Sequence, residues 1–174
     1  MYKISQTLLM PCILVVFITI AKAEVPPELE SIQFSGPKIT PSPACLCAAA
    51  TGEVFVGVDM LGSLGKGPGK GKIIRLIDAD GDGVADKHTV YANIDNPRGL
   101  ISVGTKLYVL HTVIPASTGK LNGMHLSVLE DKNWDGVADG EPKKLISDIS
   151  PPKHNQDRGA DHTTNGIRMG IDGW

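Results

Sequence analysis

The sequence lacks a dominant charge. Its 174 residues include 17 Lys and Arg against 19 Asp and Glu, which gives a formal net charge of −2 at pH 7. Binding to nucleic acid or to an anionic membrane surface relies on a clear excess of basic side chains. The near balance therefore predicts no nucleic-acid partner and no electrostatic attachment to a membrane surface.

Cysteine is also scarce, with three in the whole chain. None belongs to a Cys-x-x-Cys-His sequence, so these residues contain no c-type haem attachment motif. Cys45 and Cys47 are two positions apart, and a disulfide between such close neighbours would be strained. We interpret both as small apolar side chains in a core.

Long hydrophobic runs are absent after the first 20 residues. The apolar run Leu8–Ile20 is shorter than the roughly 20 residues that a membrane-spanning helix needs. Lys3 precedes it, and Ala21-Lys22-Ala23 has the small–x–small pattern of a cleavage site. These features are typical of a secretory signal peptide. The sequence therefore predicts a signal peptide at residues 1–23 and an exported protein, periplasmic or extracellular.

What is present is an acidic loop that occurs twice. The copies begin at Asp78 and Asp131, 53 residues apart, and carry oxygen side chains at positions 1, 3, 5 and 9 with glycine at position 6. This spacing, completed by a backbone carbonyl at position 7, is typical of a loop that wraps a calcium ion. The predicted ligands are Asp78, Asp80, Asp82, the Val84 carbonyl and Asp86 in the first acidic loop, and Asp131, Asn133, Asp135, the Val137 carbonyl and Asp139 in the second.

The two loops are predicted to be structural sites between strands. Thr89 and Pro142 stand where an EF-hand places its bidentate Glu, so the helix-flanked version is excluded. Four carboxylates in the first loop repel one another unless a cation neutralises them. The second loop has one charge fewer, and we expect it to bind more weakly. The alternative is a solvated acidic turn, since Asp-Gly is common in hairpins.

The 53-residue spacing extends beyond the loops. Three pairs of segments repeat at this distance: Glu53–Asp59 with Lys106–Thr112, Ile73–Ile77 with Leu126–Glu130, and His88–Ala92 with Glu141–Leu145. They are short, and several are rich in β-branched and aromatic residues, as strands are. Nothing after the signal peptide has a sustained helical period. A repeat of roughly 50 residues with several short strands is typical of a β-propeller blade.

We therefore predict an all-β fold, a partial β-propeller of about two blades and the start of a third. It occupies residues 44–174 and follows a Pro-rich lead-in segment at residues 24–43. Because propellers close with about four to eight blades, the chain is expected to be the N-terminal fragment of a longer protein. The third unit begins later than the repeat predicts, and the excess lies in a polar insertion at residues 150–164. Such insertions often carry function.

The insertion contains the candidate for chemistry. His162 lies beside Asp161, with Asn165 shortly after. A neutral histidine accepts a proton from an alcohol near pH 7. The alternative is a surface histidine in a polar loop. His111 and His125 lie in strand-like segments, and we interpret them as packing residues.

The glycine-rich stretch Gly62–Lys72 resembles a phosphate loop only superficially. No Gly-Lys in it is followed by Ser or Thr, and no helix is expected after it. We interpret it as a flexible basic loop that could meet an anionic ligand.

Three stretches carry a family resemblance: residues 52–72, the loop at residues 78–86 with Asn96–Leu100, and Arg158–Trp174. Together they resemble the N-terminal propeller of the large secreted, membrane-bound dehydrogenase-type proteins of planctomycete-type bacteria. That propeller is similar to the soluble glucose and sorbosone dehydrogenases, whose motif runs His, Asn-Gly, then Gly-x-Asp-Gly before an aromatic residue. Here the order is His162, Asn165-Gly166, Gly170, Asp172-Gly173 and Trp174, with two threonines after the histidine and Ile171 in place of the usual proline.

The resemblance implies a quinone-dependent sugar or alcohol dehydrogenase with pyrroloquinoline quinone and calcium as cofactors. His162 would take the hydroxyl proton of the substrate while hydride passes to the quinone, and electrons would pass to a c-type cytochrome domain in the full-length chain. The Arg and Lys that hold the cofactor would follow Trp174. The alternative function is a non-catalytic, calcium-stabilised propeller that binds glycans or proteins, because propellers host many functions.

Overall fold

The computed structural model describes residues 26–60, 67–162, 164–170 and 172–173. The predicted signal peptide lies outside these residues. The chain divides into two compact units, Met1–Ser31 and Ile32–Trp174. In the first unit, the described residues contain a turn in which the amide of Leu29 donates to the carbonyl of Pro26 at 2.9 Å. Within the described part of the chain, no helix is long and apolar enough to cross a membrane.

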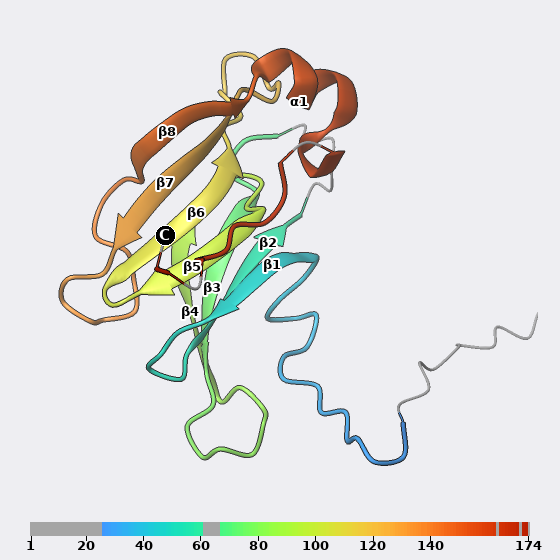
Figure 1. Ribbon diagram of the computed structural model, residues 1–174, viewed down its shortest axis with the longest axis vertical. Coiled ribbons are helices and arrows are strands. Elements are labelled where there is room, and N and C mark those ends of the chain that lie inside the picture. The colour runs from blue at the N-terminus through green and yellow to red at the C-terminus, as the bar shows by residue number, and fades with distance from the viewer. Residues whose placement is uncertain (1–25, 61–66, 163, 171, 174) are drawn as a thin grey trace, which may run out of the picture. The chain divides into compact units, whose positions relative to one another are not determined.

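The second unit is built from two four-stranded antiparallel sheets (Figure 1). In each sheet the strands follow one another in chain order, so that every connection joins neighbours. The first sheet contains β1 (Pro43–Ala48), β2 (Val54–Asp59), β3 (Gly71–Ile77) and β4 (Lys87–Asn93). The second contains β5 (Gly99–Val103), β6 (Lys106–Thr112), β7 (Met124–Glu130) and β8 (Lys143–Ser150).

The predicted all-β class is confirmed, and the repeat is visible in the strand bounds. β3 and β7 begin and end 53 residues apart. Strand β5, which begins at Gly99, lies outside the predicted segments. One predicted strand needs correction. The last predicted strand, Glu141–Leu145, lies further along the chain as β8, because Pro142 has no amide hydrogen to donate to a neighbouring strand.

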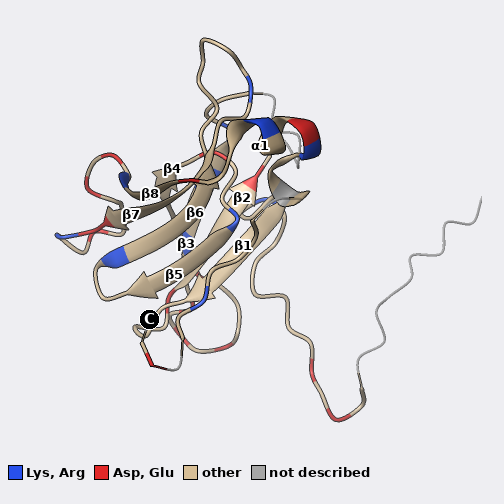
Figure 2. Ribbon diagram, turned by 45° about the horizontal axis from the view of Figure 1, so that its top comes forward, with Lys and Arg blue, Asp and Glu red and all other residues tan. Residues whose placement is uncertain are grey.

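A short helix in the polar insertion was not expected. Helix α1 (Pro152–Arg158) begins with proline, whose fixed φ suits a first turn, and is followed by a 3₁₀ turn, η1 (Ala160–His162). The side chain of Asn155 donates to the Asn122 carbonyl at 2.5 Å, which ties the helix to the loop between β6 and β7. Lys153 and Asp157 pair at 2.6 Å with exposed side chains, and Figure 2 shows acidic and basic residues on this helix.

Alternation along the strands sends side chains from both sheets into one core. Phe55, Ile73 and Tyr91 of the first sheet join Leu107, Val109 and Leu129 of the second in a single buried cluster. The rings of Phe55 and Tyr91 meet edge to face, with centroids 5.0 Å apart. Each such side chain contributes about 1.5–3 kcal/mol by burial, so this shared core holds the sheets together. β1 and β5, the first strands of their sheets, lie side by side (Figure 1).

The outer faces of the pair are covered by irregular segments. Phe34 and Ile39, which precede β1, pack on the face of the first sheet formed by Val56, Val58, Ile74 and Leu76. On the second sheet, Ala160 and Ile167 cover Leu110 and Met124.

The strand order sorts the connections to two opposite ends. The acidic loops follow β3 and β7 and therefore lie at one end. The connections after β4 and β6, and helix α1 after β8, lie at the other end (Figure 1). The metal candidates are thus separated from His162 by the length of the strands.

Candidate metal centres

The first acidic loop is folded around its own carboxylates. Asp78 accepts hydrogen bonds from the amides of Gly81 at 2.7 Å and Gly83 at 2.9 Å, and Asp86 accepts one from Ala79 at 2.6 Å. Carboxylate oxygens of Asp78, Asp80 and Asp86 all lie within 4.8 Å of one another. Three of the four predicted acidic ligands are therefore gathered at one point. Asp82 accepts the amide of Val84 at 2.8 Å and stands outside this group.

The second acidic loop repeats four of the five amide–carboxylate bonds of the first, and the bond from Gly81 to Asp78 has no counterpart in it. Asp131 accepts from Gly136 at 2.9 Å, and Asp139 accepts from Lys132 at 2.7 Å. Asn133 and Asp135 accept from the amides two residues on, at 3.1 Å and 2.8 Å, as Asp80 and Asp82 do in the first loop. Sequences that differ at several positions thus reach one backbone geometry, as expected if both are shaped to present oxygens inward.

Position 6 of each loop requires glycine. Gly83 and Gly136 have φ angles of 87° and 86°, a left-handed conformation that other residues adopt only at a cost. At position 4 the loops differ: Gly81 has φ 80°, whereas Trp134 is held at φ 61° in the second loop. Trp134 is 58 % exposed, so only part of its side chain contacts its surroundings.

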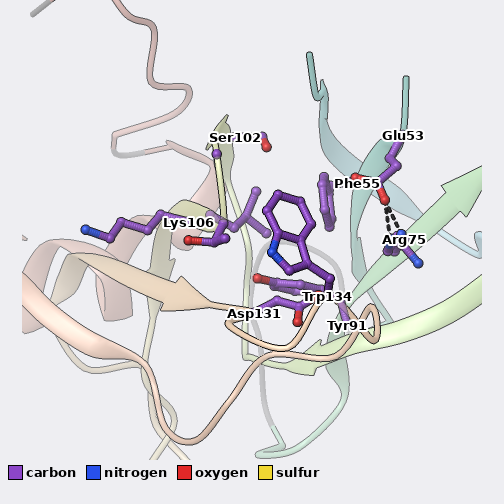
Figure 3. Close-up of a pocket in the computed structure, with 11 residues that line it drawn as sticks. Glu53, Phe55, Arg75, Tyr91, Ser102, Lys106, Asp131 and Trp134 are labelled. Carbon is purple, nitrogen blue, oxygen red and sulfur yellow. Dashed lines mark hydrogen bonds and ion pairs between the residues drawn. The ribbon is translucent and has the colours of Figure 1, made fainter. Parts of the chain in front are cut away.

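Those surroundings belong to both sheets. Trp134 projects from the second acidic loop toward a cavity of about 20 Å³, which has room for about one water molecule (Figure 3). The wall from the first sheet includes Phe55, Tyr91 and the ion pair between Arg75 and Glu53. The second acidic loop is consequently packed against the neighbouring sheet.

Asp131 is the only buried carboxylate of the two acidic loops. Asp131 is 8 % exposed. Its Oδ1 has no hydrogen-bond partner, whereas its Oδ2 accepts the Gly136 amide within the loop. A buried oxygen without a partner costs about 1–3 kcal/mol, and more when it is charged. Asp78, which is half-buried, has both oxygens satisfied by amides. Weaker binding by the second loop, which has one charge fewer, stays a prediction.

The negative charge of the second loop reaches across to the first sheet. Burial raises the pKa of Tyr91 to about 12, and the carboxylates of Asp131 and Asp139 add to the effect. The charge of this loop therefore acts on a residue of the core that the two sheets share.

His162 lies at the opposite end, on the last residue of η1, with an exposed side chain. Asn165 and Arg168 follow it on an exposed segment. The segment runs beside β5, where the amide of Gly166 donates to the Arg98 carbonyl at 3.0 Å. A methyl group on Gly99 would lie 2.8 Å from the amide nitrogen of Ile167, so this close approach requires glycine. The side chain of Asp161 lies outside the described residues.

A buried ion pair that was not predicted from the sequence lies at the same end of the strands as His162. Arg98 donates to Asp59 at 2.6 Å, and both side chains are almost fully buried. Asn96 is 1 % exposed, and its Oδ1 has no hydrogen-bond partner. The sequence around Asn96 and Arg98 has the pattern of an ordinary turn, so the burial of these two residues is visible only in the fold.

The glycine-rich stretch binds a carboxylate of its own chain. Asp95 Oδ1 accepts the amides of Gly69 at 2.9 Å and Lys70 at 3.2 Å. In the described part of the stretch, the amides of Gly69 and Lys70 are therefore occupied by a carboxylate. Residues 61–66 of the stretch lie outside the described part.

The two strand histidines are buried as predicted, and one has a specific partner. His111 Nδ1 lies 3.1 Å from the Thr112 carbonyl, which can only accept, so Nδ1 carries the hydrogen. Nε2 then accepts the hydroxyl of Ser127 at 2.8 Å. Burial lowers the pKa of His111 to about 4, and it also lowers that of His125. Ser127 is 1 % exposed, so the pair is a satisfied polar contact in the core.

Cys45 and Cys47 are unpaired, half-buried and packed against the shared core. Burial raises the pKa of the Cys45 thiol to about 12 and that of Cys47 to about 11. Both thiols stay protonated at neutral pH, which makes them poor metal ligands.

These features define an all-β protein made of two repeated four-strand units, each with an acidic loop between its third and fourth strands. Residues 20–174 match the model of a family described as a domain of unknown function, DUF7133, and the chain belongs to that family. No curated protein and no solved structure matches it.

Proposed function

We propose that this chain is a calcium-stabilised part of a β-propeller, in which the two sheets are consecutive blades. The observation that carries the proposal is the repeated acidic loop. Four of the five amide–carboxylate bonds of the first loop recur in the second, and the fifth is missing at a buried carboxylate oxygen that has no partner. The side-by-side placement of β1 and β5 supports the blade arrangement, since first strands line the centre of a propeller.

The ion would be held by oxygen ligands alone, as calcium prefers. Asp78, Asp80 and Asp86 would hold it in the first loop, and Asp131, Asn133 and Asp139 at the same positions in the second. Asp82, Asp135 and the carbonyls of Val84 and Val137 complete the predicted sets. Calcium here would neutralise repelling carboxylates and fix the turn between two strands.

Titration calorimetry of the chain with calcium chloride tests this proposal. We expect two binding events, of which Asp86→Asn removes one and Asp139→Asn the other, because these residues hold the same position in the two loops. Magnesium, which demands a smaller octahedral cage, serves as the control. A chain that binds no calcium at millimolar concentration in calorimetry would end the proposal.

A second candidate function is the quinone-dependent dehydrogenase implied by the family resemblance. The observation that favours it is the position of His162, exposed at the end opposite the acidic loops, where the insertion and the connections between sheets meet. His162 would take the proton from a substrate hydroxyl as hydride leaves the adjacent C–H for the acceptor. Arg98 forms an ion pair with Asp59, so an anionic cofactor would need other basic residues to hold it.

Reduction of an acceptor dye by the full-length protein, with pyrroloquinoline quinone and a panel of sugars and alcohols, separates this candidate from a binding protein. We expect turnover that His162→Ala lowers by about 100-fold or more, as loss of a general base does. The matched control is His154→Ala, on an exposed position of α1. Glycan or protein binding without any turnover would favour the non-catalytic alternative.

A further inference from the structure

The second acidic loop is hydrogen-bonded to the other sheet. The amide of Ala138, at position 8 of the loop, donates to the carbonyl of Tyr91 on β4 at 2.9 Å. Ala138 also packs against the core that the two sheets share. A loop of the second sheet therefore forms part of the interface with the first.

A second contact reinforces this connection. Gly136 lies so close to Arg75 of β3 that a methyl group in its place would collide with the guanidinium. Arg75 is fixed in turn by Glu53, and Trp134 stands at the same junction (Figure 3). The position of the loop and the position of the first sheet thus depend on each other.

The first acidic loop provides a matched comparison. Ala85 is the residue equivalent to Ala138, and its amide donates to the carbonyl of Phe34 at 2.9 Å. A methyl group on Gly83 would meet Ile32 at 3.4 Å. The same bond therefore connects the first loop to the segment before β1, and not to another sheet.

The conformation of the second loop depends on how the negative charge of its carboxylates is neutralised. Asp131 is more than nine-tenths buried, one of its oxygens has no partner, and Asp135 and Asp139 add like charges nearby. Without a cation, repulsion and the unpaired oxygen both favour opening of the loop, which would withdraw the Ala138 amide from Tyr91.

We propose that a divalent calcium-type cation in the loop Asp131–Asp139 strengthens the contact between the two sheets, so that this loop acts as a cation-dependent latch while the first loop does not. The inference rests on the proposed function, since it requires the loop to bind the cation. It adds that binding and sheet contact are coupled. Coupling of this kind is reciprocal: whatever weakens the latch must weaken cation binding by the same factor.

Trp134 allows the second loop to be observed alone. Terbium takes calcium sites and luminesces when an adjacent indole transfers energy to it, and the first loop has glycine at the equivalent position. Trp174 is replaced by Phe in the starting protein, so that emission reports the loop containing Trp134.

The test compares Ala138→Pro with Ala85→Pro in this background. Proline has no amide hydrogen, so each change removes one latch bond without touching a predicted side-chain ligand. We expect Ala138→Pro to lower terbium and calcium affinity at the second loop by at least about five-fold, the lower end of typical coupling. Ala85→Pro should change that affinity by less than about two-fold.

Hydrogen exchange of the starting protein provides the second measurement, should Ala138→Pro fail to fold. Calcium should slow exchange at the Ala138 amide and along β4, and Asp131→Asn should abolish that slowing, whereas Asp78→Asn should not. Two results would overturn the latch alone, provided that terbium emission shows binding at the second loop. The first is a cation affinity in Ala138→Pro equal to that of the starting protein. The second is hydrogen exchange at the Ala138 amide that does not depend on calcium. No emission and no calorimetric binding in the starting protein would overturn the proposed calcium function and the latch together.

Discussion

Arg98 Nη2 donates to Asp59 Oδ2 at 2.6 Å, and the two side chains are 7 % and 4 % exposed. Asp59 is the last residue of β2, and Arg98 directly precedes β5, so this ion pair joins the first sheet to the second. Buried charges need their partners far more than surface charges do.

Loss of Arg98 should therefore be costly. Arg98→Met leaves the Asp59 carboxylate buried without its cation, and we expect a fall of about 3–5 kcal/mol in the free energy of unfolding, measured in urea. The control is Lys153→Met, which breaks an exposed pair whose lysine is 82 % exposed and should cost at most about 1 kcal/mol. Equal effects from the two changes would show that the buried pair is not a structural tie.

The buried histidine makes stability depend on pH. In the unfolded chain His111 takes a proton near its ordinary pKa of 6.5, but burial holds the folded pKa at about 4. Between these values the unfolded state binds more protons, so stability falls as pH drops from 6.5 toward 4. At pH 5 the loss from this residue alone is about 2 kcal/mol relative to neutral pH.

The repeat suggests a variant that removes this dependence. Val58 and Ile74 occupy in the first sheet the positions of His111 and Ser127 in the second. The double change His111→Val and Ser127→Ile should flatten the acid side of the pH–stability curve while keeping the fold. A curve with unchanged slope between pH 4 and 6.5 would assign the acid sensitivity to other groups.

Gly136 should tolerate substitution less well than a glycine of similar backbone. Gly136→Ala places a side chain at φ 86° and against Arg75, whereas Gly140→Ala meets strain at φ 83° with nothing within 4 Å. Strain alone costs about 1–2 kcal/mol. We expect Gly140→Ala to cost this much and Gly136→Ala clearly more, measured by urea unfolding in calcium. Equal costs would mean that Arg75 moves aside freely.

Much of the fold could be predicted because the same pattern of strands occurs twice in the sequence. The segment Lys106–Thr112 was predicted to the residue as β6, and His88–Ala92 lies inside β4. Helix α1 could not be predicted in this way, since its seven residues are too few for a periodic pattern. It is held in part by bonds to distant residues, such as that of Gln156 to the Leu121 carbonyl at 2.7 Å.

The sequence predicted the position of both acidic loops but not the difference between them; their role as metal ligands stays a prediction. The spacing of oxygen side chains identified both acidic loops, and the four amide–carboxylate bonds that they share follow from that spacing. The different burial of Asp78 and Asp131 arises from what packs around each loop, a peptide segment in one case and a sheet in the other. Nothing local to either loop records that difference, because it depends on contacts more than 40 residues away in sequence.

The glycine-rich turn before β3 should depend on Asp95. This carboxylate accepts the amides of Gly69 and Lys70 from across more than 20 residues of sequence, and bonds to a charged acceptor contribute about 1.5–3 kcal/mol. Asp95→Ala should lower stability by about this amount and speed hydrogen exchange at both amides.

Asp95→Asn is the matched control, because it keeps an acceptor oxygen but loses the charge. Its stability and its exchange rates at both amides should lie between those of the unmodified protein and Asp95→Ala. Added phosphate should slow exchange at these amides only in Asp95→Ala, where the site is vacated. Protection by phosphate in the unmodified protein would mean that the carboxylate does not fill the turn, and that an external anion does.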